Sequence, residues 1–285
     1  MLVNLDRVLK KAKAGGYAVG LFNTHDTDML EAAISEAEAA RSPIIIGTAE
    51  VLLPYGDLPL IAPALIAAAK RATVPVVVHF DHGLTFERTM EALKLGFSSV
   101  MYDASAKDFA SNVAETAEVT KIAHAFGATI EGEIGHVGLA QDGEDRNGGR
   151  YTTTAEAVDF QTKTGVDALA VAVGNAHGVY KTKPHLQLDR IAELNAAVKC
   201  PLVMHGGSGL SDDDFRNAIA RGIAKVNIHT DMVCAGMRAM YEQCDAHDRN
   251  RIATWDYLDT RRARVDAIRA VVARKLELFG SVGRA

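Results

Sequence analysis

The sequence predicts a single (β/α)8 barrel, the TIM-barrel fold, and three observations indicate it. Eight short apolar, β-branched segments alternate with alanine-rich segments of helical periodicity. Several of them, such as Val-Pro-Val-Val-Val-His, are apolar at successive positions, which is typical of parallel strands buried on both faces. The length of 285 residues suits one barrel with a small addition. An open doubly wound sheet is the alternative, but no G-x-G-x-x-G follows the first strand.

The expected elements follow from this periodicity. We expect strands at 17–22, 43–47, 74–80, 98–102, 128–133, 168–173, 202–205 and 225–228. Helical patterns lie between them, for example at 28–40, 86–95, 108–126, 155–164 and 212–221. One domain should therefore span residues 1–285, with an extra helical segment after Cys244 that is available to a neighbouring subunit. The polar segment 138–150 reads as a functional loop.

Composition excludes several classes of function. The net charge is −5 and the isoelectric point about 6.1, so no electrostatic footprint for nucleic acid exists. The basic run at 261–264 is expected to be a solvated or subunit-facing helix surface. The longest apolar candidate, 59–69, is interrupted by Pro63 and is too short to span a membrane.

The cysteines and the N-terminus indicate the compartment. Cys200, Cys234 and Cys244 are odd in number and form no C-x-x-C pair, which favours reduced thiols over a disulfide framework. The N-terminal residues lack the charged start and apolar core of a signal peptide. The expected location is the cytoplasm.

Reactive side chains gather at the carboxyl ends of the expected strands. They are Asp81 and His82 after the third strand, Asp103 after the fourth, Glu133 at the end of the fifth, His177 after the sixth, His205 at the end of the seventh and Asn227 near the end of the eighth. Because all these ends open on one face of a barrel, the side chains should converge. One histidine at such a position is more often a hydrogen-bonded core or rim residue, but three favour a metal site.

The chemistry of three imidazoles fits a catalytic zinc ion. His82, His177 and His205 would leave a fourth position open for substrate or water. Such an ion polarises a carbonyl or stabilises an enediolate. Asp81, adjacent to a ligand, can donate or accept a proton at the reacting oxygen.

A glycine-rich segment after the seventh strand predicts a phosphate site. Gly206, Gly207 and Ser208 are followed, after the eighth strand, by Ile228, His229 and Thr230. Barrels often hold phosphate on these two loops, although the glycines alone fit a tight strand-to-helix turn equally well.

In these motifs and in their order, the chain resembles the class II, metal-dependent fructose- and tagatose-bisphosphate aldolases. The resemblance runs in order from about residue 4 to residues 279–281. The segments that carry it are Tyr-Ala-Val-Gly-Leu-Phe-Asn at 17–23, His-Phe-Asp-His-Gly at 79–83, Met-Tyr-Asp-Ala-Ser at 101–105, Glu-Gly-Glu-Ile-Gly at 131–135, Ala-Val-Gly-Asn-Ala-His-Gly at 172–178, Met-His-Gly-Gly-Ser-Gly at 204–209 and Lys-Val-Asn-Ile-His-Thr at 225–230.

The resemblance implies roles for these positions. His82, His177 and His205 would bind one catalytic Zn²⁺, and Asp81 would be the proton donor to the aldehyde oxygen. Asp103 and Glu133 match a second metal position. The phosphate and hydroxyketone of dihydroxyacetone phosphate would be held, with help from a monovalent cation (Na⁺ or K⁺), by Gly178, Gly206, Gly207, Ser208, Asn227, Ile228, His229 and Thr230. The implied reaction is reversible aldol cleavage of a phosphorylated ketose, by a homodimer or homotetramer.

Three departures leave the sugar open. Gly83 stands where many bisphosphate aldolases have histidine. Gln141 occupies the position of the usual glutamate base, with the acidic residues up to Asp145 as substitutes after a small shift. Ala49 takes the place of the serine or threonine that often meets the second phosphate, with Thr48 one residue away. A keto-sugar acid or another ketose with one phosphate therefore becomes a candidate substrate.

Three other functions remain as alternatives. A Schiff-base aldolase needs a lysine that points into the site, and we expect Lys225 to lie at the opposite, N-terminal end of its strand. A zinc hydrolase would be expected to carry an H-x-H or H-E-x-x-H pair, which is missing. A non-catalytic sugar-phosphate sensor or accessory subunit would have little reason to keep Asp81.

Overall fold

The computed structural model describes residues 1–138, 151–178, 184–246 and 253–285, and it confirms the predicted barrel. All strand pairings are parallel, and the sheet closes because β4 pairs with both β3 and β5 while β2 pairs with β9. The eight barrel strands are β2 (Val19–Asn23), β3 (Ile44–Ala49), β4 (Val76–Gly83), β5 (Ser99–Tyr102), β6 (Thr129–Ile134), β7 (Ala168–Val171), β8 (Leu202–Met204) and β9 (Ile223–Ile228).

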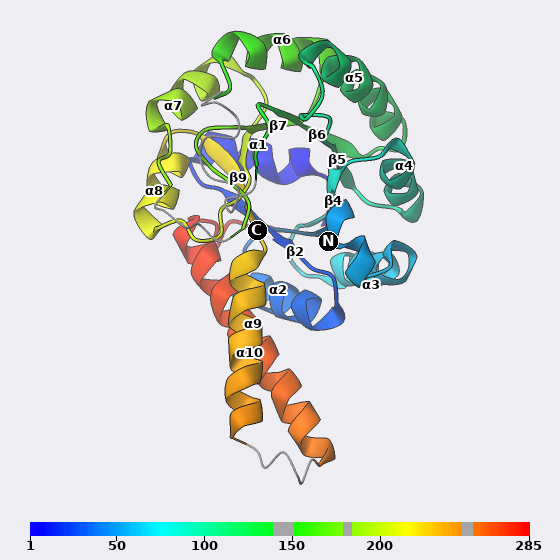
Figure 1. The fold of residues 1–285 in the computed structure, drawn as a ribbon, viewed down its shortest axis with the longest axis vertical. Helices are drawn as coiled ribbons and strands as arrows, with labels where there is room; N and C mark the ends of the chain where they lie inside the picture. The colour runs from blue at the N-terminus through cyan, green and yellow to red at the C-terminus, as the bar shows by residue number, and fades with distance from the viewer. Residues whose placement is uncertain (139–150, 179–183, 247–252) are drawn as a thin grey trace.

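Helices surround this barrel (Figure 1). They are α1 (Leu5–Gly15), α2 (Thr27–Ala39), α3 (Leu58–Arg71), α4 (Phe86–Leu95), α5 (Phe109–Ala125), α6 (Thr154–Thr164), α7 (Leu188–Ala197), α8 (Asp212–Ala220), α9 (Thr230–Asp245) and α10 (Thr254–Leu278), with a short 3-10 helix η1 (Glu50–Tyr55). The local sequence determines where several helices begin. Thr153 forms a capping box with Glu156 at the start of α6, and Ser211 forms one with Asp214 at the start of α8. None of the helices within the described residues is both long and apolar enough to cross a membrane.

The N-terminal segment closes one end of the barrel. A short strand β1 (Leu2–Val3) pairs with the first residues of β4, below the point at which β5 begins to pair. Helix α1 then packs Leu5, Val8 and Leu9 into the apolar layer inside the strands. The opposite, carboxyl end of the barrel is therefore the open mouth, as expected for this fold.

The C-terminal helix packs on α9 and α2 of its own chain. Within the basic run 261–264, Arg261 and Arg264 form ion pairs with Asp28 of α2, whereas Arg262 is exposed as expected. Only the far part of α10, together with α9, extends away from the barrel as a helical pair (Figure 1). The C-terminal part of α10 packs on the barrel side, and its buried side chains include Val265, Ile268, Val272 and Leu276.

Candidate metal centre and active site

The three predicted histidines meet at the mouth of the barrel. His82 Nε2 lies 2.7 Å from His205 Nδ1 and 3.1 Å from His177 Nε2. The potential ligand atoms of the three residues all lie within 4.8 Å of one another. His205 is fully buried, and the other two are largely covered.

The second nitrogen of each ring has an acceptor. His82 Nδ1 lies 2.8 Å from Asp103 Oδ2, His205 Nε2 lies 2.7 Å from Glu131 Oε1, and His177 Nδ1 lies 3.2 Å from the carbonyl of Val137. Because the outer nitrogen of each ring has an oxygen acceptor, the inner nitrogens are the ones available to a metal ion. Three imidazole nitrogens that converge in this way fit a three-histidine zinc site.

Backbone geometry brings two consecutive residues of β4 to this site. Along a strand, alternate side chains point to opposite faces, so Val77, His79 and Asp81 point into the barrel. His82 would then point outward, but its φ of 43° lies in the left-handed region and the pairing of β4 with β5 shifts between Phe80 and Gly83. This strained conformation turns the imidazole toward the mouth.

Gly83 has a local structural cause. A Cβ at this position would lie 2.4 Å from Thr89 Oγ1 and 2.6 Å from the carbonyl of Met101. The glycine therefore fits the close packing of β4 against α4 and β5. This packing explains Gly83 without reference to the substrate.

Asp81 is held as a carboxylate by two amide donors. Asn23 Nδ2 donates to Asp81 Oδ2 at 2.7 Å, and Asn227 Nδ2 donates to Asp81 Oδ1 at 3.0 Å. Burial alone would raise the pKa of Asp81, but the neighbouring His82 and His205 hold it well below its ordinary range. The group is therefore ionised and able to accept a proton.

Asp103 and Glu133 form a second acidic group with His82, also within 4.8 Å. Ser105 Oγ lies between the two groups, 2.6 Å from Asp103 Oδ1 and 3.1 Å from Glu133 Oε1. Burial and the charge of Asp103 raise the pKa of Glu133 to about 8. Burial also acts to raise the pKa of Asp103, but hydrogen bonds from His82 and Ser105 outweigh it and hold this pKa well below its ordinary value. The two residues expected at a second metal position thus lie together beside the histidines.

The predicted phosphate residues lie around the N-terminus of α9. Ser208 Oγ accepts from the backbone N–H groups of His229 and Asp231, at 3.4 Å and 3.2 Å. Gly206 has a φ of 62° and approaches Ala176 so closely that a Cβ would lie 2.1 Å from its carbonyl oxygen. Thr230 is the first residue of the helix, and Gly207 and Ile228 are buried beside it. Gly178, with a φ of 96°, follows His177.

Four buried polar residues near the site were not expected there from the sequence. His79, Glu131, Lys225 and Asn23 lie inside the barrel below the histidines and contact the site directly or through one another. Their signal was the two-residue spacing within strands, since Glu131 and Glu133, and likewise Lys225 and Asn227, face the same way. That spacing identifies inward positions once the strand register is known.

The expectation for Lys225 was wrong. It lies in the middle of β9 and not at its N-terminal end, and its Nζ is fully buried in the barrel, 2.8 Å from Glu131 Oε2 and 2.8 Å from Asn227 Oδ1. Both contacts hold the amine in place and away from the mouth. A Schiff-base role remains unsupported, for this different reason.

The expected general base lies outside the described residues. Gln141, Asp142, Glu144 and Asp145 all belong to the segment 139–150. Thr48 and Ala49 at the end of β3 are described. Because side chains alternate along a strand, Thr48 points outward like Ile44 and Ile46, and Ala49 points into the barrel like Ile45. Neither residue presents a hydroxyl to the mouth.

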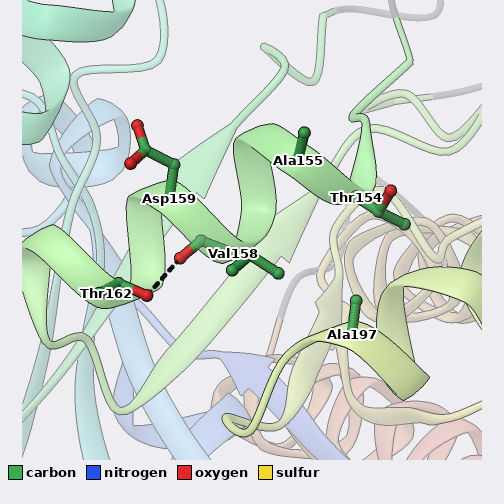
Figure 2. A pocket seen from close by; sticks show the side chains of 6 residues that line it. All are labelled: Thr154, Ala155, Val158, Asp159, Thr162 and Ala197. Atoms are coloured by element: carbon green, nitrogen blue, oxygen red, sulfur yellow. Dashed lines mark hydrogen bonds between the residues drawn. The ribbon is translucent and has the colours of Figure 1, made fainter.

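A surface hollow lies away from the barrel mouth. It lies between α6 and the end of α7 and is lined by Thr154, Ala155, Val158, Asp159, Thr162 and Ala197 (Figure 2). Asp159 is its one ionisable residue, so it offers no convergent set of reactive groups. The described clusters of histidine and acidic side chains lie at the barrel mouth instead.

Comparison with known proteins agrees with this geometry. The family model for class II fructose-bisphosphate aldolase matches residues 3–284. A fructose-bisphosphate aldolase of Thermus caldophilus is 37% identical, with 100% of both chains covered. The crystal structure of the YdjI aldolase from Escherichia coli K12 superposes with a TM-score of 0.89 at 36% identity, again covering 100% of both chains.

A further relative agrees as well. A probable fructose-bisphosphate aldolase of Bacillus subtilis is 36% identical, covering 100% of this chain and 99% of its own. The chain therefore belongs to the class II fructose-bisphosphate aldolase family, lyases that cleave sugar phosphates to dihydroxyacetone phosphate and an aldehyde.

Proposed function

We propose that the protein catalyses zinc-dependent, reversible aldol cleavage of a phosphorylated ketose or keto-sugar acid, releasing dihydroxyacetone phosphate and an aldehyde. The observation that carries this proposal is the convergence of three imidazole nitrogens beside an ionised, amide-held Asp81. One zinc ion per subunit, held by His82, His177 and His205, would polarise the ketose carbonyl.

Asp81 would move the proton of the reaction. In the cleavage direction its carboxylate accepts the proton of the hydroxyl group whose carbon becomes the aldehyde carbon, as the adjacent carbon–carbon bond breaks. In the condensation direction the same group returns the proton to the aldehyde oxygen. The donors on Asn23 and Asn227 favour the ionised form, so the resting enzyme is prepared for cleavage. The base that acts on dihydroxyacetone phosphate stays a prediction within 141–145.

Asn23 supplies a further polar group to the substrate. Its Oδ1 is buried without a hydrogen-bond partner among the described residues, while its Nδ2 donates to Asp81. A buried carbonyl oxygen without a partner costs free energy, which a substrate hydroxyl would recover. We therefore place a hydroxyl of the aldehyde half beside Asn23 and Asp81.

The phosphate would bind at the N-terminus of α9. Backbone N–H groups at a helix start and the helix dipole both favour an anion there. Gly206, Gly207 and Gly178 allow close approach, and Ser208, His229 and Thr230 flank the helix start. A Na⁺ or K⁺ ion beside the phosphate stays a prediction.

The described end of β3 bears on the substrate class. The described end of β3 offers Ala49 inward, and Thr48 points outward, so this strand supplies no hydroxyl for a second phosphate. This favours a ketose with one phosphate, or a keto-sugar acid, over fructose or tagatose bisphosphate. A screen of phosphorylated ketoses and ketose acids on zinc-loaded enzyme tests the choice, and a clear preference for a bisphosphate would overturn it.

The metal dependence has a direct test. Release of dihydroxyacetone phosphate, measured with a coupled dehydrogenase, should disappear after treatment with EDTA and return when zinc is added. The coupling enzyme must be checked separately in the same buffer. Full activity in chelator would refute the proposal.

We also propose that the protein forms a homodimer or homotetramer in the cytoplasm. The helical pair α9–α10 extends from the barrel and exposes Tyr241, Trp255 and Tyr257, side chains that are common in subunit interfaces. The cysteines are all free, which suits a reducing compartment. Sedimentation at micromolar concentration, with Trp255→Ser as the variant, tests the assembly; a monomeric wild-type protein would contradict it.

A further inference from the structure

A continuous polar chain runs below the metal centre and ends at Asp81. Glu131 uses one oxygen, Oε1, for His205 and the other, Oε2, for Lys225. Lys225 Nζ also contacts Asn227 Oδ1, and the Nδ2 of that amide donates to Asp81. Lys225 therefore stands between the carboxylate that orients a predicted metal ligand and the amide that holds the predicted proton carrier.

The chemistry of lysine fixes the direction of this chain. An ammonium group has three donors and no acceptor, so Asn227 must turn its oxygen toward Lys225. Its NH2 group is thereby directed at Asp81. With a 180° flip of the amide, an N–H would face the ammonium group and an oxygen would face the carboxylate, two repulsive contacts. An uncharged, non-donating side chain at position 225 would remove this constraint.

Lys225 also fixes the position of Glu131. Its Nζ lies 2.8 Å from Glu131 Oε2, and Glu131 Oε1 lies 2.7 Å from His205 Nε2. Because Glu131 accepts from Nε2, the lone pair of the His205 ring is on Nδ1, which faces the metal centre. Both ends of the chain thus depend on the same ammonium group.

We propose that Lys225 is a positioning residue that couples the geometry of His205 to that of Asp81, acting through Glu131 and Asn227. The proposal rests on the function proposed above for these two residues. The competing explanation is that Lys225 only neutralises Glu131 in a dry interior, as buried ion pairs require.

Two double variants separate these explanations. Lys225→Met alone leaves Glu131 unpaired and can prevent folding, so Glu131→Gln is combined with it; this substitution keeps an oxygen acceptor for His205 Nε2. Glu131→Gln/Lys225→Met has no donor at position 225, whereas Glu131→Gln/Lys225→Gln keeps an uncharged donor on a side chain of similar length. Lys199→Met, at an exposed site, serves as the control.

We expect both double variants to fold and to bind zinc with equal affinity. That affinity should be about 10-fold to 100-fold below the wild-type value, because Glu131, the hydrogen-bond partner of the metal ligand His205, is changed in both. The kcat for cleavage should fall at least about 10-fold further in the Met variant than in the Gln variant, with little change in KM. Equal kcat values in the two variants would overturn the proposal, because charge neutralisation would then be the whole role of Lys225.

A readout without substrate keeps this test separate from the proposed reaction. The side-chain amide signals of Asn227 in ¹⁵N–¹H spectra should be slow to exchange in the wild type and the Gln variant, and fast to exchange in the Met variant. Unchanged signals in the Met variant would overturn the proposal. A wild type that binds zinc but cleaves no ketose would refute the proposed function, while the amide signals would still decide the role of Lys225.

Discussion

The two ends of the barrel interior are built from the same strands but hold opposite chemistry. At the N-terminal end the inward side chains are apolar: Val19, Leu21, Ile45, Val77 and Val203 pack against α1. Two or four residues further along β2 and β4, the inward side chains are Asn23, His79 and Asp81, and Glu131 and Lys225 contact this polar group from β6 and β9; all five are buried.

The comparison shows how stability and chemistry divide along a strand. Apolar burial contributes about 25 cal/mol per Å² at the closed end. At the mouth, burial of charge costs free energy unless each group finds a partner, so the polar layer is a network. We therefore expect changes at the closed end to alter stability, and changes at the mouth to alter zinc binding and turnover.

The largest expected effect is on catalysis at the mouth. Asp81→Asn should lower kcat/KM for cleavage by about 10²-fold to 10⁴-fold, because the amide cannot accept the proton. Zinc content, measured by atomic absorption, should be unchanged. The matched control is Asp6→Asn in α1 at the closed end, which should leave turnover unaltered. Turnover of the Asp81 variant near the wild-type value would remove this residue from the mechanism.

A second prediction compares two inward residues of one strand, β2. Leu21→Ala should lower the free energy of unfolding by about 2–5 kcal/mol, since a fully buried side chain leaves a cavity. Urea titration measures this, and kcat of the folded enzyme should hold. Asn23→Ala should show the reverse pattern, with a larger loss in kcat than in stability. Similar profiles for the two variants would refute the division between the ends.

A third prediction concerns the partner of His82. Asp103→Asn should weaken zinc binding by about 10-fold to 100-fold, because a neutral amide oxygen is a poorer acceptor for His82 Nδ1. Competition with a chelating dye measures the affinity. Asp159→Asn, on the outer face of α6, is the control. Equal affinities would mean that the ring of His82 is oriented by other contacts.

The smallest expected effect is the slow alkylation of Cys200, the buried thiol at the closed end of the barrel. Burial raises the pKa of Cys200 to about 12, so the thiol is neutral at pH 8 and becomes reactive only as the pH approaches that value. Iodoacetamide at pH 8 should modify the exposed Cys234 and Cys244 and spare Cys200, as read by mass spectrometry. Modification of all three at similar rates would show that this end of the barrel opens readily.

Much of the fold was predictable because apolar patterns are local. The run Ile44–Ile46 and the run Ala168–Val171 became strands within a residue or two of their expected bounds. The ion pairs of Arg261 and Arg264 were not predictable, because their acidic partners at the start of α2 and within it lie more than 200 residues away in sequence. No pattern within α10 indicates that its basic side chains contact α2.

The candidate site was predictable only in part. Position at strand ends was enough to select His82, His177, His205 and Asp81, and the structure brings them together. The wrong expectation for Lys225 arose because the strand was predicted to begin at residue 225. Lys225 would then be the first residue at the N-terminal end, but β9 begins two residues earlier, at Ile223. Roles for all these residues stay predictions until the variants are measured.

The sequence by itself determined the barrel, its eight strands and the residue types at their carboxyl ends, since periodicity and motif order are properties of the linear chain. Only the tertiary structure decided how those residues act on one another. The left-handed turn at His82, the amide direction of Asn227 and the buried link from Glu131 through Lys225 depend on strand register and side-chain packing. These contacts join residues up to 146 positions apart, so no local pattern could encode them.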